Sequence, residues 1–188
     1  VWREAVAADG TVSAIYRVFT EANPSWMRLV LKQEVLDKLG VADVPVTIAD
    51  WDALFEKMLA AGITPFMLTA TGYDEKFIGA FDVRQDFYKD GDAIKYGQIQ
   101  EGFKQYLALM HDWYAKGYIS KDFVSASNVD TMFAMDQIGT YDKPIVAAYN
   151  FGIKEGYTVL SSPYPRQTAD QFLHWDSYKA SVVSKNLT

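Results

Sequence analysis

Two adjacent acids, Asp74 and Glu75, occur in the stretch MLTATGYDEKF (67–77), where an apolar run gives way to polar and aromatic residues. A pair of carboxylates can hydrolyse a glycoside when the two groups face each other across the sugar. Side chains of neighbouring residues diverge on a helix or a strand, so these two acids cannot form such a pair with each other. Two interpretations remain open: acids at the start of a helix, where exposed N–H groups favour them, or acids in contact with a ligand.

Other catalytic and metal chemistries lack their residues. The chain has no Cys and only two His, His111 and His174, and it contains neither HExxH nor GxSxG nor the phosphate-binding GxGxxG and GxxxxGK[ST] patterns. His111 lies opposite the apolar stripe of its predicted helix and is expected to be solvated. His174, beside Trp175, either lines a pocket or caps a strand. We therefore predict no catalytic residue, no metal and no cofactor.

The charge and composition narrow the class of partner. A net charge of −6 and a pI of about 4.9 argue against a nucleic-acid partner, which requires clustered Lys and Arg. No run approaches the ~18 apolar residues of a membrane span. Aromatic residues make up 15% of the chain, a content that suits either a sugar- or protein-binding surface or a Tyr-rich core.

Predicted strands and helices alternate along the chain, which is typical of an α/β fold. Strands are expected where apolar residues alternate or run together between turn residues, at 26–32, 64–71, 138–142, 157–162 and 177–185. Asp9-Gly10 and Asp90-Gly91 each predict a hairpin.

Apolar residues at helical spacing predict helices at 33–40, 48–61, 100–116, 129–136 and 144–156. Thr47 and Asp50 predict a capping box at the start of the second helix. Apolar faces are expected to comprise Ile48, Trp51, Phe55, Met58 and Leu59 in that helix, and Phe103, Tyr106, Leu107, Met110, Trp113 and Tyr114 in the third. The large rings Trp51, Tyr106 and Trp113 are therefore predicted to be core residues.

Polar and aromatic residues follow two of the predicted strands. TGYDEKF (71–77) comes directly after one strand, and TYDKP (140–144) closes another, and each places a Tyr and then an Asp at that point. In open α/β sheets, ligands bind outside the carboxyl ends of the strands. The pattern therefore favours binding over catalysis.

Four segments, in this order, resemble one family: RLVLKQEVLDKLGV, PVTIADWDALFEKMLAAGITPFML, YGQIQEGFKQYLALMHDWYAKGYISKDF and MFAMDQIGTY. The family is that of the extracellular solute-binding proteins of ABC importers, specifically the lipoprotein type that takes up carbohydrates in Gram-positive bacteria. The resemblance covers about residues 12–184. The chain departs from the family pattern at FTEANPSW (19–26), where a Gly-rich stretch is common, and at residues 120–123, where the family often has "dpdf".

The resemblance implies an α/β fold that forms one lobe of a two-lobe periplasmic-binding-protein-like (type II) architecture, with a mixed sheet flanked by helices. Residues 1–188 would form this single lobe, with hinge-crossing strands near 11–19 and 177–185. It further implies a cell-surface lipoprotein outside the cell, whose lipid anchor would lie in a preceding segment and whose partners are ABC permease subunits.

The function expected from the resemblance is extracellular binding of a solute, a sugar or oligosaccharide, for uptake and without catalysis. For stacking on the ligand we predict Trp26, Tyr73, Phe77, Tyr141 and Trp175, and for polar contacts Arg28, Asp74 and Asp142. The residues leave two alternatives open: a glycan-active enzyme domain using carboxylates, and a protein-interaction domain without a small ligand.

Overall fold

The computed structural model describes residues 27–68 and 75–173, which all belong to one compact unit, 26–177. The hairpin predicted at Asp9-Gly10 and the crossing strands predicted near 11–19 and 177–185 lie outside the described residues. In chain order, the elements are β1 (Met27–Lys32), α2 (Gln33–Lys38), α3 (Ile48–Ala60), β2 (Thr64–Met67), α4 (Glu75–Ile78), η1 (Gly79–Phe81), β3 (Phe87–Asp90), β4 (Ala93–Tyr96), η2 (Gly97–Ile99), α5 (Glu101–Ala115), α6 (Val129–Ala134), β5 (Ile138–Pro144), α7 (Ile145–Glu155) and β6 (Val159–Ser161).

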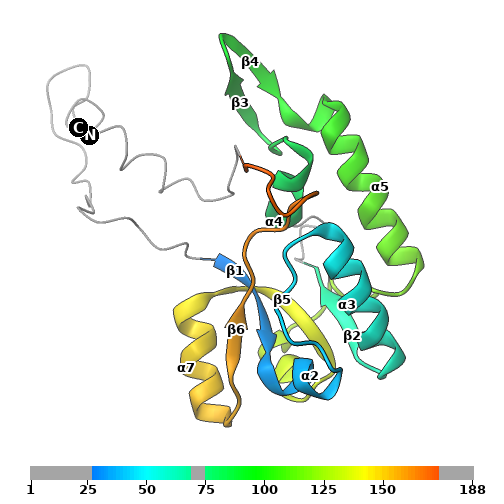
Figure 1. Cartoon of the computed structure of the whole chain (residues 1–188), viewed down its shortest axis with the longest axis vertical. Helices are drawn as coiled ribbons and strands as arrows, with labels where there is room; N and C mark the ends of the chain where they lie inside the picture. The colour runs from blue at the N-terminus through cyan, green and yellow to red at the C-terminus, as the bar shows by residue number, and fades with distance from the viewer. Residues whose placement is uncertain (1–26, 69–74, 174–188) are drawn as a thin grey trace, which may run out of the picture. The chain divides into compact units, whose positions relative to one another are not determined.

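The centre of this unit is a four-stranded sheet with the strand order β2-β5-β1-β6 (Figure 1). β2 and β5 are parallel, whereas β1 is antiparallel to both β5 and β6. The predicted α/β fold with a mixed sheet flanked by helices is therefore confirmed.

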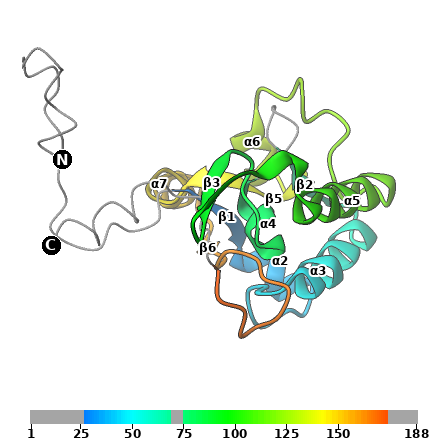
Figure 2. The same cartoon turned by 90° about the horizontal axis from the view of Figure 1, so that it is seen from above.

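Side chains that alternate along the strands pack into two separate hydrophobic cores, one on each face of the sheet. Leu29 and Leu31 of β1 pack with the aromatic residues of α3, α4 and α5. Val30, between them, packs on the opposite face with residues of α6, α7 and β6. The two helical layers are seen from above in Figure 2. A central strand that is apolar on both faces explains why RLVLK lacks the polar alternation of a half-exposed strand.

Helix α3 begins as its sequence predicts. The Asp50 backbone N–H donates to Thr47 Oγ1 at 3.1 Å, while the Thr47 N–H donates to Asp50 Oδ2 at 2.8 Å, which completes a capping box. Gly62, at φ +79°, follows the end of the helix in the left-handed region that favours glycine.

The buried faces of α3 and α5 differ from the predicted ones. In α3, Leu54 is buried, while Leu59, expected on the apolar face, is 42% exposed. In α5, Leu107 and Tyr114 are both more than two-fifths exposed, although Tyr106 and Trp113 are fully buried as predicted. A helix that rests on one side buries only the side chains that point at its neighbours, and sequence spacing alone does not identify all of them.

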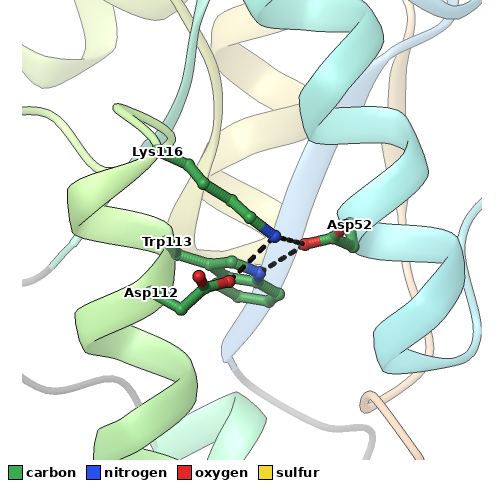
Figure 3. A network of polar contacts seen from close by, with 4 residues as sticks. All are labelled: Asp52, Asp112, Trp113 and Lys116. Carbon is green, nitrogen blue, oxygen red and sulfur yellow. Dashed lines mark hydrogen bonds and ion pairs between the residues drawn. The ribbon is translucent and has the colours of Figure 1, made fainter.

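A polar tie joins α3 and α5 beside their shared aromatic core (Figure 3). The indole Nε1–H of Trp113 donates to Asp52 Oδ1 at 2.9 Å, and Lys116 Nζ lies 3.2 Å from the same oxygen. Lys116 also pairs with Asp112 at 2.8 Å, and hydrogen bonds to Asp112 and Asp52 raise the pKa of its ammonium group. Because the Trp113 ring has no exposed surface, Asp52 supplies the acceptor that its buried N–H requires. We call Asp52, Asp112, Trp113 and Lys116 the helix tie.

The hairpin predicted at Asp90-Gly91 is formed by β3 and β4, with Phe87 paired to Tyr96 across the strands. Gly91 adopts φ +58° in the turn. Tyr88 is turned inward and buried, whereas Phe87 and Ile94 are about 70% exposed.

Candidate functional site

Three strands end on one side of the four-stranded sheet, where β1 begins. β6 and β5 are each antiparallel to β1, and β2 is parallel to β5, so β2, β5 and β6 all point the same way. The register sets Arg28 opposite Lys143 and Leu29 opposite Asp142. We call this side of the sheet the strand-end edge. It is the position at which α/β sheets bind their ligands.

A buried ion pair crosses the strand-end edge from α4 to β5. Lys76 Nζ lies 2.9 Å from Asp142 Oδ2, and the two side chains are only 6% and 8% exposed. The sequence-based role of Asp142 was a polar contact to a ligand, and the structure engages its carboxylate with Lys76. Lys76 was not predicted, although its position two residues after Asp74, at a strand end, was a usable signal.

Two of the aromatic residues that the sequence predicts to stack on a ligand, Phe77 and Tyr141, lie within the described residues, and both are buried. Phe77 has no exposed surface, and its ring meets those of Trp51, Phe66 and Trp113 edge-on at 4.9–5.5 Å. Its assignment as a ligand-stacking residue is therefore corrected to a core role, because α4 places its side chain among the core residues of α3, β2 and α5. Tyr141 is 5% exposed and packs on Phe133 with ring centroids 5.1 Å apart.

Tyr141 instead belongs to a polar cluster on the α6 side of the edge. Its hydroxyl donates to Asp130 Oδ1 at 2.6 Å, and Lys143 Nζ lies 2.5 Å from Asp130 Oδ2. Burial favours a raised pKa for Asp130, but the hydrogen bonds from Lys143 and Tyr141 outweigh it and lower the pKa of this carboxyl. Burial, together with the hydrogen bond to Asp130, raises the pKa of the Tyr141 hydroxyl. Asp130 is therefore ionised at pH 7, and its negative charge balances that of the Lys143 side chain.

Arg28 differs from its neighbours at the edge because an aromatic ring, not a carboxylate, holds it. The guanidinium carbon lies 4.2 Å from the centroid of the Tyr164 ring. The Tyr164 hydroxyl donates to the carbonyl oxygen of Met27 at 3.3 Å, which fixes the ring beside β1.

Arg28 and Tyr164 line a pocket of about 400 Å³. We call it the Arg28 pocket, and its lining residues are Arg28, Pro163, Tyr164, Arg166, Asp170, Gln171, Phe172 and Leu173. This volume lies within the range of roughly 300–1,000 Å³ that is usual for small-molecule sites. Phe172 is 75% exposed and offers an accessible ring.

The segment that forms the far wall of the pocket is anchored at two points. The Ile48 N–H donates to the Arg166 carbonyl at 2.8 Å, and the Arg166 N–H donates to Val46 at 3.0 Å. Gln171 Nε2 donates to the carbonyl oxygen of Ala80 at 3.1 Å. These contacts join the segment after β6 to α3 and to η1. Arg166 and Phe172 were not predicted, since their loop carries no strand or helix pattern.

A second hollow, of about 730 Å³, lies between residues 41–46 and α3. Its charged lining residues are Asp43, Asp50 and Lys57, and Asp50 already serves the capping box. None of its lining residues belongs to a strand of the four-stranded sheet or directly follows one, so we do not place the candidate site there.

Four of the nominated residues, Trp26, Tyr73, Asp74 and Trp175, lie outside the described residues. His111 is exposed, as predicted.

Within residues 27–68 and 75–173, no group of three or more His, Asp or Glu is placed to hold a metal ion. In the same ranges, no helix has the length and apolar character needed to cross a membrane.

Comparisons with known proteins identify the fold. No protein-family model matches the sequence, and no curated protein is significantly similar to it. Among solved structures, the alginate-binding protein AlgQ2 without calcium ion superposes with a TM-score of 0.62 at 17% identity, over 73% of this chain and 32% of that protein. RafE from Streptococcus pneumoniae in its apo form superposes with a TM-score of 0.57 at 18% identity, over 77% of this chain and 40% of that one.

These likenesses identify the fold of the chain. The chain has a periplasmic-binding-protein fold, and its mixed sheet flanked by helices corresponds to one lobe of that architecture. It spans 32% of the length of the first of these solved proteins and 40% of the second.

Proposed function

We propose that the chain is one lobe of an extracellular solute-binding protein that captures a sugar or oligosaccharide for an ABC importer. The observation that carries the proposal is the Arg28 pocket at the strand-end edge, where the Arg28 guanidinium rests on the buried Tyr164 ring and Phe172 adds an exposed ring. Rings that stack on the apolar faces of a sugar, beside donors that reach its hydroxyls, are the usual lining of such sites. The likeness to an alginate-binding protein supports a saccharide as the ligand.

Capture would require a second lobe. In two-lobed binding proteins the ligand lies in the cleft, and closure about a hinge reports occupancy. Residues 1–188 would supply one wall, with the crossing strands near 11–19 and 177–185 as the hinge. Trp26, Tyr73, Asp74 and Trp175 stay predicted contacts in this scheme, together with Arg28. The permease partners and a lipid anchor outside this chain belong to the same proposal.

The described acids of the edge favour binding over glycoside hydrolysis. A glycosidase needs a carboxyl whose raised pKa keeps it protonated for general-acid catalysis. The pKa of Asp130 is lowered, and Asp142 is held by Lys76. Asp130 is therefore not suited to donate a proton at neutral pH, and the carboxylate of Asp142 is paired with a buried ammonium group.

Isothermal titration of the 188-residue chain with a panel of oligosaccharides tests the proposal. We expect weak binding, with dissociation constants near or above 1 mM, because half of the cleft is absent from one lobe. Binding to a two-lobed form should be far tighter and should raise its Tm, by mass action. Micromolar binding by the single lobe would refute the half-site interpretation.

A hydrolysis assay on the same panel separates binding from catalysis. We expect no release of reducing ends above the buffer blank. Turnover that is lost in both Asp130→Asn and Asp142→Asn would establish an enzyme in place of a binding protein.

A further inference from the structure

We infer that the Arg28 pocket binds the anionic substituent of an acidic saccharide, such as the carboxylate of a uronic acid. The inference rests on the proposed function and specifies the chemical class of its ligand. It follows from the state of the two guanidinium groups that line the pocket.

Arg28 has its donors available. Within the described residues, its guanidinium group makes no side-chain hydrogen bond or ion pair and stacks on the face of the Tyr164 ring, at 4.2 Å. The five N–H groups of a guanidinium lie in its plane, so a ring stacked on its face leaves them free to donate. No carboxylate in residues 27–68 and 75–173 forms an ion pair with Arg28, whereas Lys143, opposite it on β5, is neutralised by Asp130.

Arg166 provides a second donor in the same pocket. Its Nη1 donates to the carbonyl oxygen of Ala169 at 3.2 Å. Its Nε is buried and has no acceptor within the described part of the chain. The Arg166 guanidinium adds a second positive charge to the lining of the pocket, and only its Nη1 donates to a described acceptor.

The charge of the pocket has the opposite sign to that of the chain. Its described lining contains two guanidinium groups and a single acid, Asp170, which accepts a hydrogen bond from Thr168 Oγ1 at 2.7 Å. The whole chain carries a net charge of −6. A guanidinium fork matches a carboxylate in two parallel hydrogen bonds, which a neutral hydroxymethyl group cannot accept. The pocket therefore selects a sugar that carries an anion next to its ring.

The test is an amide chemical-shift titration of the ¹⁵N-labelled 188-residue chain. Glucuronate and glucose are compared first, since they share a ring and differ in the group on C5. We expect glucuronate to bind roughly tenfold more tightly, as a charge-assisted hydrogen bond provides, and its advantage to shrink with added NaCl. Glucose 6-phosphate and glucose 6-sulfate, titrated alongside, show which anion fits.

Arg28→Gln should abolish the preference for glucuronate, and Arg28→Lys, which keeps the charge but loses the fork, should retain only part of it. Arg84→Gln is the matched control, because it removes the same charge at a position outside the pocket lining. Amide spectra of each variant without ligand verify that it is folded.

The outcomes are distinguishable. Equal binding of glucose and glucuronate by the parent chain, or a preference that survives in a folded Arg28→Gln, overturns the acidic-saccharide inference while leaving sugar binding intact. Acetate that binds as well as glucuronate would define an anion site without sugar recognition. The absence of shifts with every saccharide would remove the proposed function itself, and the inference with it.

Discussion

The helix tie and the Arg28 pocket both combine charged groups with aromatic rings, yet they are organised differently. In the tie, Lys116 is matched by two carboxylates, and Asp52 also accepts the buried indole N–H of Trp113. In the pocket, the Arg28 guanidinium stacks on the Tyr164 ring, and the Nε of Arg166 has no acceptor among the described residues. A set of charges that is satisfied internally supports the fold, whereas one that lacks a partner is available to a ligand.

The Lys76–Asp142 pair tests this distinction most strongly, because it lies at the strand-end edge but is paired and buried like a structural element. Asp142→Ala removes the carboxylate 2.9 Å from a Lys76 side chain that is only 6% exposed. We expect the free energy of unfolding to fall by about 3–5 kcal/mol, the usual cost of breaking a buried ion pair from one side. Urea denaturation followed by circular dichroism measures it.

The double variant Lys76→Met/Asp142→Leu is the control for that measurement, since it removes both charges and should recover much of the loss. If Asp142→Ala were as stable as the parent but bound saccharide less well, Asp142 would belong with the ligand contacts predicted from the sequence.

The helix tie itself should show a smaller effect. Asp52→Ala leaves the indole N–H of the fully buried Trp113 without its acceptor, which we expect to cost about 1–3 kcal/mol of stability. Asp112→Ala is the matched control, because Asp112 also pairs with Lys116 but accepts no hydrogen bond from Trp113. It removes only the exposed pair with Lys116 and should cost about 0–1 kcal/mol.

Thermal denaturation of the two variants side by side gives their difference. Equal losses of stability would mean that the indole hydrogen bond contributes nothing beyond the surface ion pair. The helix tie would then not be a set of charges that stabilises the fold. Saccharide binding should be unchanged in both.

The smallest effect is expected from Asp130, a paired acid at the rim of the edge. Its pKa in the folded chain lies below the ordinary value of 3.8, so the ionised form stabilises the folded state. This contribution is present in full above pH 4 and disappears as the pH falls through the lower, folded-state value. Stability measured from pH 6 to pH 2.5 should decline less steeply in Asp130→Asn than in the parent. Identical slopes would show that Lys143 and Tyr141 do not stabilise the ionised carboxylate.

Local patterns predicted most of the described elements because each pattern has a local physical cause. The capping box at Thr47 and the turn at Asp90-Gly91 depend on a few adjacent residues, and both are confirmed. Helical spacing also identified Trp51 and Trp113 as core, although it assigned Leu59 and Leu107 to the buried faces when both are more than two-fifths exposed. The width of a buried stripe depends on the neighbouring helix, which is not encoded in the spacing.

The candidate site was predicted less well for the same reason. The family resemblance led to Arg28, whereas the rule that strand ends carry ligand contacts selected Phe77, which is buried in the core, and Asp142, which pairs with Lys76. Arg166 and Phe172 lie more than 130 residues from Arg28 in a loop without a recognisable pattern. Only the register of β1 against β6, and the anchoring of that loop on α3 and η1, bring them to one pocket.

By itself, the sequence determined the α/β class, the helix and hairpin boundaries, the scarcity of His and the absence of Cys, because these follow from composition and from contacts within a few residues. The tertiary structure decided which charges are satisfied. Whether Lys76, Lys143 or Arg28 meets a carboxylate depends on groups supplied by distant strands and helices. Lys76 and Lys143 each pair with an acid and stabilise the fold, whereas Arg28 stacks on a ring and lines the pocket.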